Sequence, residues 1–156
     1  MGGAVGVNLE DTYHETLTMM PEEEAVERIR RALAVARELG VDDFALNARS
    51  DALYSGEGDI DESIRRGRLY LEAGATTVYV FWPRTTEMLE EDVKKVIDGL
   101  DGRVNIQPRK ASAVQRKELT SGDVARLAAA RVSIGPQLLW GAAEAIKKRA
   151  NEIFGH

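Results

Sequence analysis

Short β-rich runs alternate with amphipathic helical segments along the whole chain. The runs lie at residues 4–9, 44–48, 77–81, 104–106 and 131–134. After each run, apolar residues recur every three or four positions, which is the spacing of a helix that buries one face. Strands that alternate with helices indicate a parallel sheet with right-handed crossovers. The sequence therefore predicts five strand–helix units.

The helix boundaries follow from caps and breakers. Pro21 suits the first position of the first helix, and Gly40 closes it. The second helix begins at a cap that is either Asp59 or Asp61 and ends at Gly74. We expect the remaining helices at residues 89–100, 120–127 and 139–153. The last of these repeats apolar residues at intervals of four, three, four and three, so we expect it to bury that stripe.

Composition narrows the class of protein. The chain has 156 residues, no cysteine and a formal net charge of −5. We expect a single domain over residues 1–156, without disulfides or thiolate metal sites. The acidic balance argues against partners such as nucleic acid or an anionic membrane. The chain has no apolar run of membrane-spanning length and no signal-peptide pattern, so we expect a cytoplasmic protein.

Five strand–helix units fit two architectures. One is an open doubly wound sheet, and the other is part of an eight-stranded α/β barrel, which normally needs about 250 residues. Periodicity and length alone favour the open sheet. In both architectures, functional side chains gather at the carboxyl ends of the strands.

Charged residues end the first two strands. Glu10 and Asp11 could hold Mg²⁺, directly or through water, or one of them could cap the following loop. Alternation places Asn47, Arg49 and Asp51 on one face of the second strand. Arg49 could bind a substrate carboxylate with two hydrogen bonds while Asp51 orients it, or the two could form an internal ion pair.

Three further features have two interpretations each. His14 could act as a general acid or base, or it could be a solvated loop residue. Phe81 and Trp82 could wall a pocket or belong to the core. The basic loop from Arg109 to Lys117 could attract an anionic substrate or simply face water.

Four segments in order resemble the isocitrate lyase and phosphoenolpyruvate mutase superfamily. They are residues 3–11 (GAVGVNLED), 47–52 (NARSDA), 70–75 (YLEAGA) and 130–136 (ARVSIGP). The resemblance implies a (β/α)8 barrel, of which this chain would be strands four to eight. It also implies Mg²⁺ and a small α-oxo acid or dicarboxylate substrate, with a C–C or P–C bond made or broken. By resemblance, Glu10 is the metal residue, usually through water, and Arg49 is the catalytic and substrate-binding residue. Because Asn47 and Asp51 share the strand face of Arg49, we expect them to bind substrate beside it.

The sequence also departs from the family pattern. The aspartate pair that anchors Mg²⁺ and the serine–glycine loop that binds the carboxylate have no counterpart here. The gating loop, residues 12–20, lacks the cysteine and lysine of the lyases. Phe81 stands where the lyases have glutamate and the mutase has histidine.

An incomplete barrel leaves two strand edges and its inner face uncovered. We therefore expect a homo-oligomer or a complementing N-terminal half. Three hypotheses stay open: an enzyme that is complete only with strands one to three, a non-catalytic half-barrel that acts as an oligomeric or partner-binding domain, and an open-sheet binding domain.

Overall fold

The strands of the computed structural model, which describes residues 3–155, form one parallel sheet in the order β1-β2-β3-β4-β5. They are β1 (Gly6–Glu10), β2 (Ala45–Ser50), β3 (Thr77–Val80), β4 (Val104–Ile106) and β5 (Arg131–Val132). Each strand pairs with the next along the chain. This order is that of a barrel, whereas a doubly wound sheet reverses its order. The partial barrel is confirmed, and the open sheet favoured by periodicity alone is wrong, because both architectures use the same strand–helix unit.

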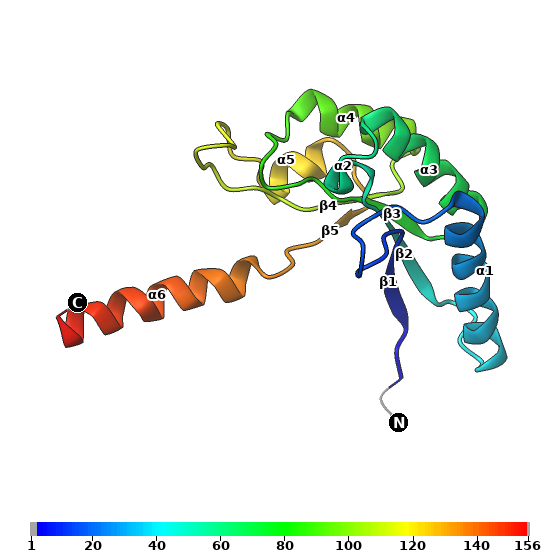
Figure 1. The fold of residues 1–156 in the computed structure, drawn as a ribbon, viewed down its shortest axis with the longest axis horizontal. Coiled ribbons are helices and arrows are strands. Elements are labelled where there is room, and N and C mark those ends of the chain that lie inside the picture. Colours follow the sequence, from blue (N-terminus) through cyan, green and yellow to red (C-terminus); the bar gives the residue numbers. More distant parts are fainter. Residues whose placement is uncertain (1–2, 156) are drawn as a thin grey trace.

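Helices cover one face of this sheet. They are α1 (Glu22–Glu38), α3 (Ile60–Glu72), α4 (Glu90–Gly99) and α5 (Ser121–Arg126). Figure 1 shows α1, α3 and α4 arranged around the outside of the strands. Strand residues that face these helices are fully buried, among them Leu46, Val78 and Val104. The hydrophobic core therefore lies between the sheet and the outer helices, as in a barrel wall.

The predicted caps are resolved by the structure. Asp59, not Asp61, is the N-cap of α3, since its side chain accepts a hydrogen bond of 2.9 Å from the Glu62 backbone N–H. Thr120 and Asp123 form a reciprocal capping box at the start of α5. One short helix was not expected from the sequence: α2 (Ala52–Ser55) is a single turn that follows β2 directly.

The inner face of the sheet is polar. Asn8, Asn47 and Thr77 are aligned across β1, β2 and β3. Asn47 donates to Asn8 over 2.6 Å and accepts from the Thr77 hydroxyl over 2.6 Å. Further along the sheet, the Asn105 amide donates to Ser133 over 2.8 Å. Amide and hydroxyl groups therefore link β1 to β3, and β4 to the residue after β5, on the side that a complete barrel would enclose.

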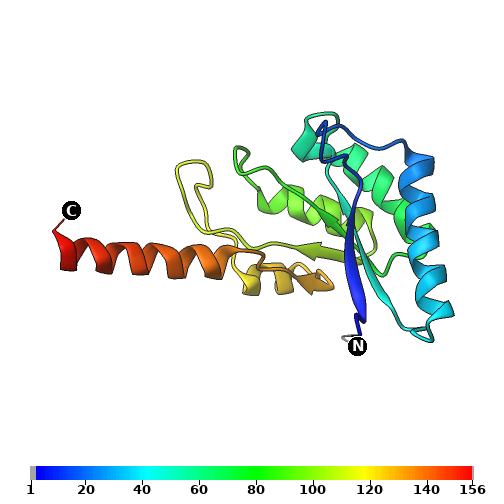
Figure 2. The ribbon, with the colours of Figure 1, turned by 60° about the horizontal axis from the view of Figure 1, so that its bottom comes forward.

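The last helix, α6 (Gln137–Phe154), extends away from the sheet (Figures 1 and 2). None of its described residues is buried, and the exposed fractions of Leu139, Ile146 and Ile153 are 69%, 70% and 60%. The expectation that this helix buries its apolar stripe is wrong for the chain by itself. The chain turns away from the sheet at Gly135 (φ 56°), so the stripe meets no apolar face within residues 3–155.

The two outer strands each have one neighbour. Apolar side chains at these edges are partly open to solvent: Val5 before β1 and Val7 within it are 75% and 41% exposed, and Ile134 after β5 is 44% exposed. These edges match the expected ends of an incomplete barrel. Within residues 3–155, no helix is both long and apolar enough to cross a membrane.

Candidate functional site

The carboxyl ends of β1 and β2 bring Glu10, Arg49 and Asp51 together. The strand register aligns Glu10 with Arg49. Arg49 Nη1 lies 2.7 Å from Glu10 Oε2, and Arg49 Nε lies 2.6 Å from Asp51 Oδ1. Three of the four residues expected in the site are therefore in direct contact. The fourth, Asn47, lies deeper on β2 within the inner-face hydrogen bonds already described.

The two carboxylates orient the Arg49 guanidinium without using all of its donors. A guanidinium has five N–H groups, and within residues 3–155 the Nη2 nitrogen of Arg49 donates no hydrogen bond. The Phe81 ring lies against the group, 4.0 Å from Cζ to the ring centroid. Arg49 is thus held from two sides, covered on one face, and able to present N–H donors to an added anion.

Asp51 is 1% exposed, and its surroundings shift the pKa of its carboxyl group. Burial raises the pKa of the Asp51 carboxyl above its ordinary value, while the hydrogen bond from Arg49 opposes part of that increase. Protonation of Asp51 would remove one of the two negative charges beside Arg49. The charge balance at the site therefore depends on pH through this residue.

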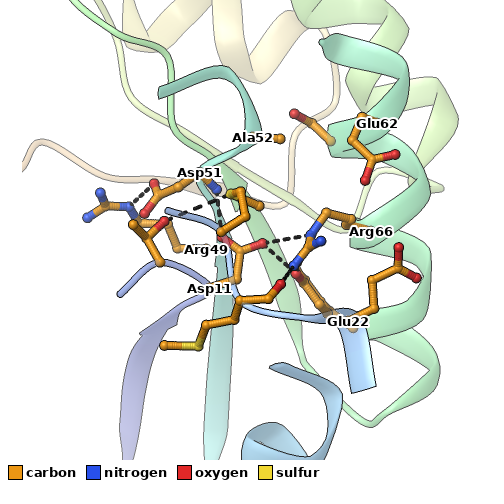
Figure 3. A network of polar contacts seen from close by, with 12 residues as sticks. Asp11, Glu22, Arg49, Asp51, Ala52, Glu62 and Arg66 are labelled. Carbon is orange, nitrogen blue, oxygen red and sulfur yellow. Dashed lines mark hydrogen bonds and ion pairs between the residues drawn. The ribbon is translucent and has the colours of Figure 1, made fainter. Parts of the chain in front are cut away.

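Asp11 has a different role from its neighbour Glu10. It is 2% exposed and accepts a 2.9 Å hydrogen bond from the backbone N–H of Asp51. The other Asp11 oxygen accepts from Arg66 Nε over 3.0 Å and from the Tyr70 hydroxyl (Figure 3). Arg66 also donates to the Met20 carbonyl over 2.8 Å. This buried network ties the site loop to α3 and holds the backbone of Asp51 in place.

Arg66 and Tyr70 were not among the residues expected from the sequence. They lie four positions apart on α3, on the face that also buries Ile64 and Gly67. Burial of Tyr70 and the adjacent Asp11 charge raise the pKa of the Tyr70 hydroxyl. The available signal was an arginine inside an apolar helical stripe, because a buried cation requires a buried partner.

His14 lies in the loop of residues 12–20, directly beside Glu10. Its Nε2 is 2.5 Å from Glu10 Oε1, and its side chain is 80% exposed. An isolated bridge between Thr12 and Met19 closes the base of this loop, and the Met19 N–H donates to Glu57 over 3.0 Å. The loop therefore places an imidazole at the outer edge of the Glu10–Arg49 pair.

The family model for phosphoenolpyruvate phosphomutase matches residues 1–154. The chain belongs to this family. The resemblance carried by the four sequence segments is thereby confirmed.

Solved structures of the phosphoenolpyruvate mutase family support the same assignment. A Burkholderia cenocepacia J2315 protein with an inferred lyase/mutase activity is 29% identical, with a TM-score of 0.80 over 97% of this chain and 52% of its own. A phosphonopyruvate hydrolase bound to oxalate and Mg²⁺ is 25% identical, with a TM-score of 0.72 over 99% of this chain and 53% of its own.

A curated relative is more similar over a shorter stretch. Petal death protein from Dianthus caryophyllus is 38% identical over 97 residues, which cover 57% of this chain and 29% of that protein. This chain thus spans less than a third of that relative and about half of the two solved structures.

Mg²⁺ accompanies one of these solved structures, so we tested the donor set for a metal site. Within residues 3–155, no group of three or more His, Cys, Asp or Glu side chains could hold a metal ion. Glu10 is paired with Arg49 and His14, and Asp11 is enclosed by Arg66 and Tyr70. The described residues do not form a magnesium site by themselves.

Proposed function

We propose that this chain supplies the anion-binding part of an enzyme that makes or breaks C–C or P–C bonds in small α-oxo acids, and that it is incomplete as an isolated chain. The observation that carries the proposal is the position of Arg49 at the carboxyl end of β2, between Glu10 and Asp51. Its Nη2 N–H groups remain available to an added anion. Family membership and the oxalate-bound phosphonopyruvate hydrolase support the same class of ligand.

Arg49 suits the chemistry of such bonds. The bond that breaks joins the carbon adjacent to the carbonyl to the departing carbon or phosphorus. Its electron pair forms a C=C double bond to the carbonyl carbon, and the C=O π pair moves onto the oxygen, which gives an enolate. A guanidinium fixed beforehand by two carboxylates stabilises that negative charge without having to reorganise. Phe81 shields one face of the guanidinium and so limits its hydration, which strengthens the electrostatic interaction. We assign Arg49 to the substrate carboxylate and the developing oxyanion, with Asp51 orienting it.

Glu10 is the residue that we propose for contact with Mg²⁺, through water. The remaining ligands would come from outside this chain, because the described residues do not complete a site. A metal beside the α-oxo acid would supply Lewis-acid stabilisation of the same oxygen. The non-catalytic half-barrel is the second candidate, and the absence of a metal cluster within residues 3–155 is the observation that favours it.

We also propose that the chain acts as a homo-oligomer or with a complementing N-terminal half. Within residues 3–155, two strand edges lack a neighbour, and the large apolar side chains of the α6 stripe, Leu139, Ile146 and Ile153, are exposed. Apolar surface of this kind gains free energy when another chain covers it.

Oxalate binding, measured by calorimetry with and without Mg²⁺, tests the proposed function. We expect Arg49→Ala to abolish binding, whereas Arg31→Ala, an equal charge change on the exposed face of α1, leaves it unchanged. Unaltered binding in Arg49→Ala would remove Arg49 from its role. If the wild-type chain binds no oxalate under any of these conditions, the half-barrel hypothesis is favoured.

A further inference from the structure

The buried network around Asp11 contacts the residue that orients Arg49. The Asp51 carboxylate accepts from Arg49 Nε over 2.6 Å, and the Asp51 backbone N–H donates to Asp11 Oδ1 over 2.9 Å. The Asp51 carbonyl accepts from the Ser55 backbone N–H over 2.8 Å, which closes the single turn of α2. Asp11 and α2 therefore fix the main chain of Asp51, and the position of that main chain determines where the carboxylate holds Arg49.

Two side chains of α3 hold Asp11 in turn. Its Oδ2 accepts from Arg66 Nε over 3.0 Å and from the Tyr70 hydroxyl. Arg66 Nε also lies 2.9 Å from the Tyr70 oxygen, so the three side chains are in mutual contact. All three are buried, and a buried carboxylate that loses a donor gains no replacement from water. Figure 3 shows Arg49 and Arg66 on opposite sides of the two aspartates, so a continuous row of hydrogen bonds connects α3 to Arg49.

The contact with Asp51 is the more rigid of the two carboxylate contacts of Arg49. The Asp51 side chain is 1% exposed, whereas the Glu10 side chain is 23% exposed and also contacts the exposed His14. Glutamate has one more rotatable bond than aspartate, and a partly solvated side chain keeps much of its rotamer freedom. Glu10 can therefore follow a shift of the Arg49 guanidinium, whereas Asp51 sets its direction.

Tyr70 is the member of the network that can be altered with the least other change. Within residues 3–155, its hydroxyl bonds only with Asp11 and Arg66. Arg66, by contrast, also donates to the Met20 carbonyl over 2.8 Å and so helps to hold the loop of residues 12–20. Removal of the Tyr70 hydroxyl therefore loosens Asp11 while the ion pair of Asp11 with Arg66 remains.

We propose that Tyr70 and Arg66 are positioning residues for the anion site. Through Asp11 and Asp51, they hold the Arg49 guanidinium in the direction in which it receives the anion. This role rests on the proposed function, which assigns the anion to Arg49. Tyr70 and Arg66 themselves make no contact with that anion, because Asp11 and Asp51 lie between them and Arg49.

The affinity of Tyr70→Phe for oxalate, measured by calorimetry in the presence of Mg²⁺, tests this role. Phenylalanine keeps the buried ring and removes one donor to a charged group, so we expect oxalate to bind about tenfold more weakly than in wild type. Tyr13→Phe is the matched control, because it removes a tyrosine hydroxyl that donates to the exposed Glu24 carboxylate. Water can replace that donor, so the control should bind oxalate as tightly as wild type.

The Asp51→Ala background separates positioning from a general loss of packing. Without the Asp51 carboxylate the network no longer acts on Arg49, so Tyr70→Phe should cause no further loss of oxalate affinity in this background. Far-ultraviolet circular dichroism checks that each variant is folded at the temperature of the titration. Equal losses in the two backgrounds would overturn the positioning role.

Hydrogen exchange of the Asp51 backbone amide, followed by nuclear magnetic resonance, tests the same connection without a ligand. Tyr70→Phe should accelerate the exchange of this amide by about tenfold, whereas Tyr13→Phe should leave it unchanged. An unchanged exchange rate in Tyr70→Phe would contradict the connection between α3 and Asp51.

The outcomes distinguish this role from the proposed function. Oxalate binding that is absent from wild type, or that Arg49→Ala leaves unchanged, contradicts the proposed function and removes the role with it. Arg49-dependent binding that Tyr70→Phe leaves unchanged contradicts the positioning role alone.

Discussion

Replacement of Arg66 by methionine should destabilise the fold strongly. Methionine keeps much of the side-chain length but removes the charge and the hydrogen bonds to Asp11 and to the Met20 carbonyl. The side chains of Arg66 and Asp11 are only 7% and 3% exposed, so water cannot replace the lost partner. Breaking a buried ion pair by removing one member typically costs about 3–5 kcal/mol. We expect a loss near the lower end, about 3 kcal/mol, because Tyr70 still donates to Asp11.

The neighbouring arginine provides a matched control. Arg65 makes ion pairs with Glu22 and Glu62, but its side chain is 50% exposed. Exposed ion pairs contribute little to stability, so Arg65→Met should change the unfolding free energy far less than Arg66→Met. Both values come from urea denaturation followed by far-ultraviolet circular dichroism. Asp11→Asn in the Arg66→Met background should recover part of the loss, since a neutral amide leaves no unpaired buried charge.

Similar losses in Arg66→Met and Arg65→Met would refute this reasoning. A loss from Arg66→Met that Asp11→Asn does not reduce would also contradict it, because the cost would then arise from packing alone. Either result would mean that the Asp11 network contributes little to holding the site loop against α3.

The remaining predictions concern ionisation and assembly. The pKa of Asp51 is raised in the folded state, so the folded chain binds the Asp51 proton more readily than the unfolded chain. The ionised carboxyl therefore lowers the free energy of unfolding at neutral pH. This cost decreases as pH falls toward the ordinary pKa of 3.8. The unfolding free energy of Asp51→Asn, relative to that of wild type, should therefore be higher at pH 7 than near pH 3.8. A difference that stays the same at both pH values in urea unfolding would contradict this prediction. Light scattering should show an oligomer that Leu139→Glu/Ile146→Glu dissociates while the control Lys147→Glu does not. A monomeric wild-type chain with a cooperative melt would contradict the assembly proposal.

The strand tips were the part of the site most accessible from the sequence. Alternation along β2 places Arg49 and Asp51 on one face, and a parallel sheet aligns β1 beside it, so the contact with Glu10 follows from the fold class. The strand order did not follow from periodicity, because open sheets and barrels share one repeating unit. It was the order of the four family-like segments that favoured the barrel.

The spacing of residues in the sequence could not predict two features, the partner of Arg66 and the surface that covers α6. Arg66 lies on the buried face of α3, a position that spacing can indicate, but its partner Asp11 is 55 residues away in the sequence and is identified only by the structure. The stripe of α6 has the spacing of a buried helix, yet spacing does not say which chain supplies the covering surface. Both cases concern partners that are distant in sequence or absent from this chain.

The central claim, that Arg49 is an anion-binding residue positioned by Glu10 and Asp51, is tested most directly by one titration. Oxalate added to wild-type protein and to Arg49→Ala in the presence of Mg²⁺ should give saturable heat with the first and none with the second. Equal heats and equal affinities for the two proteins would contradict the claim.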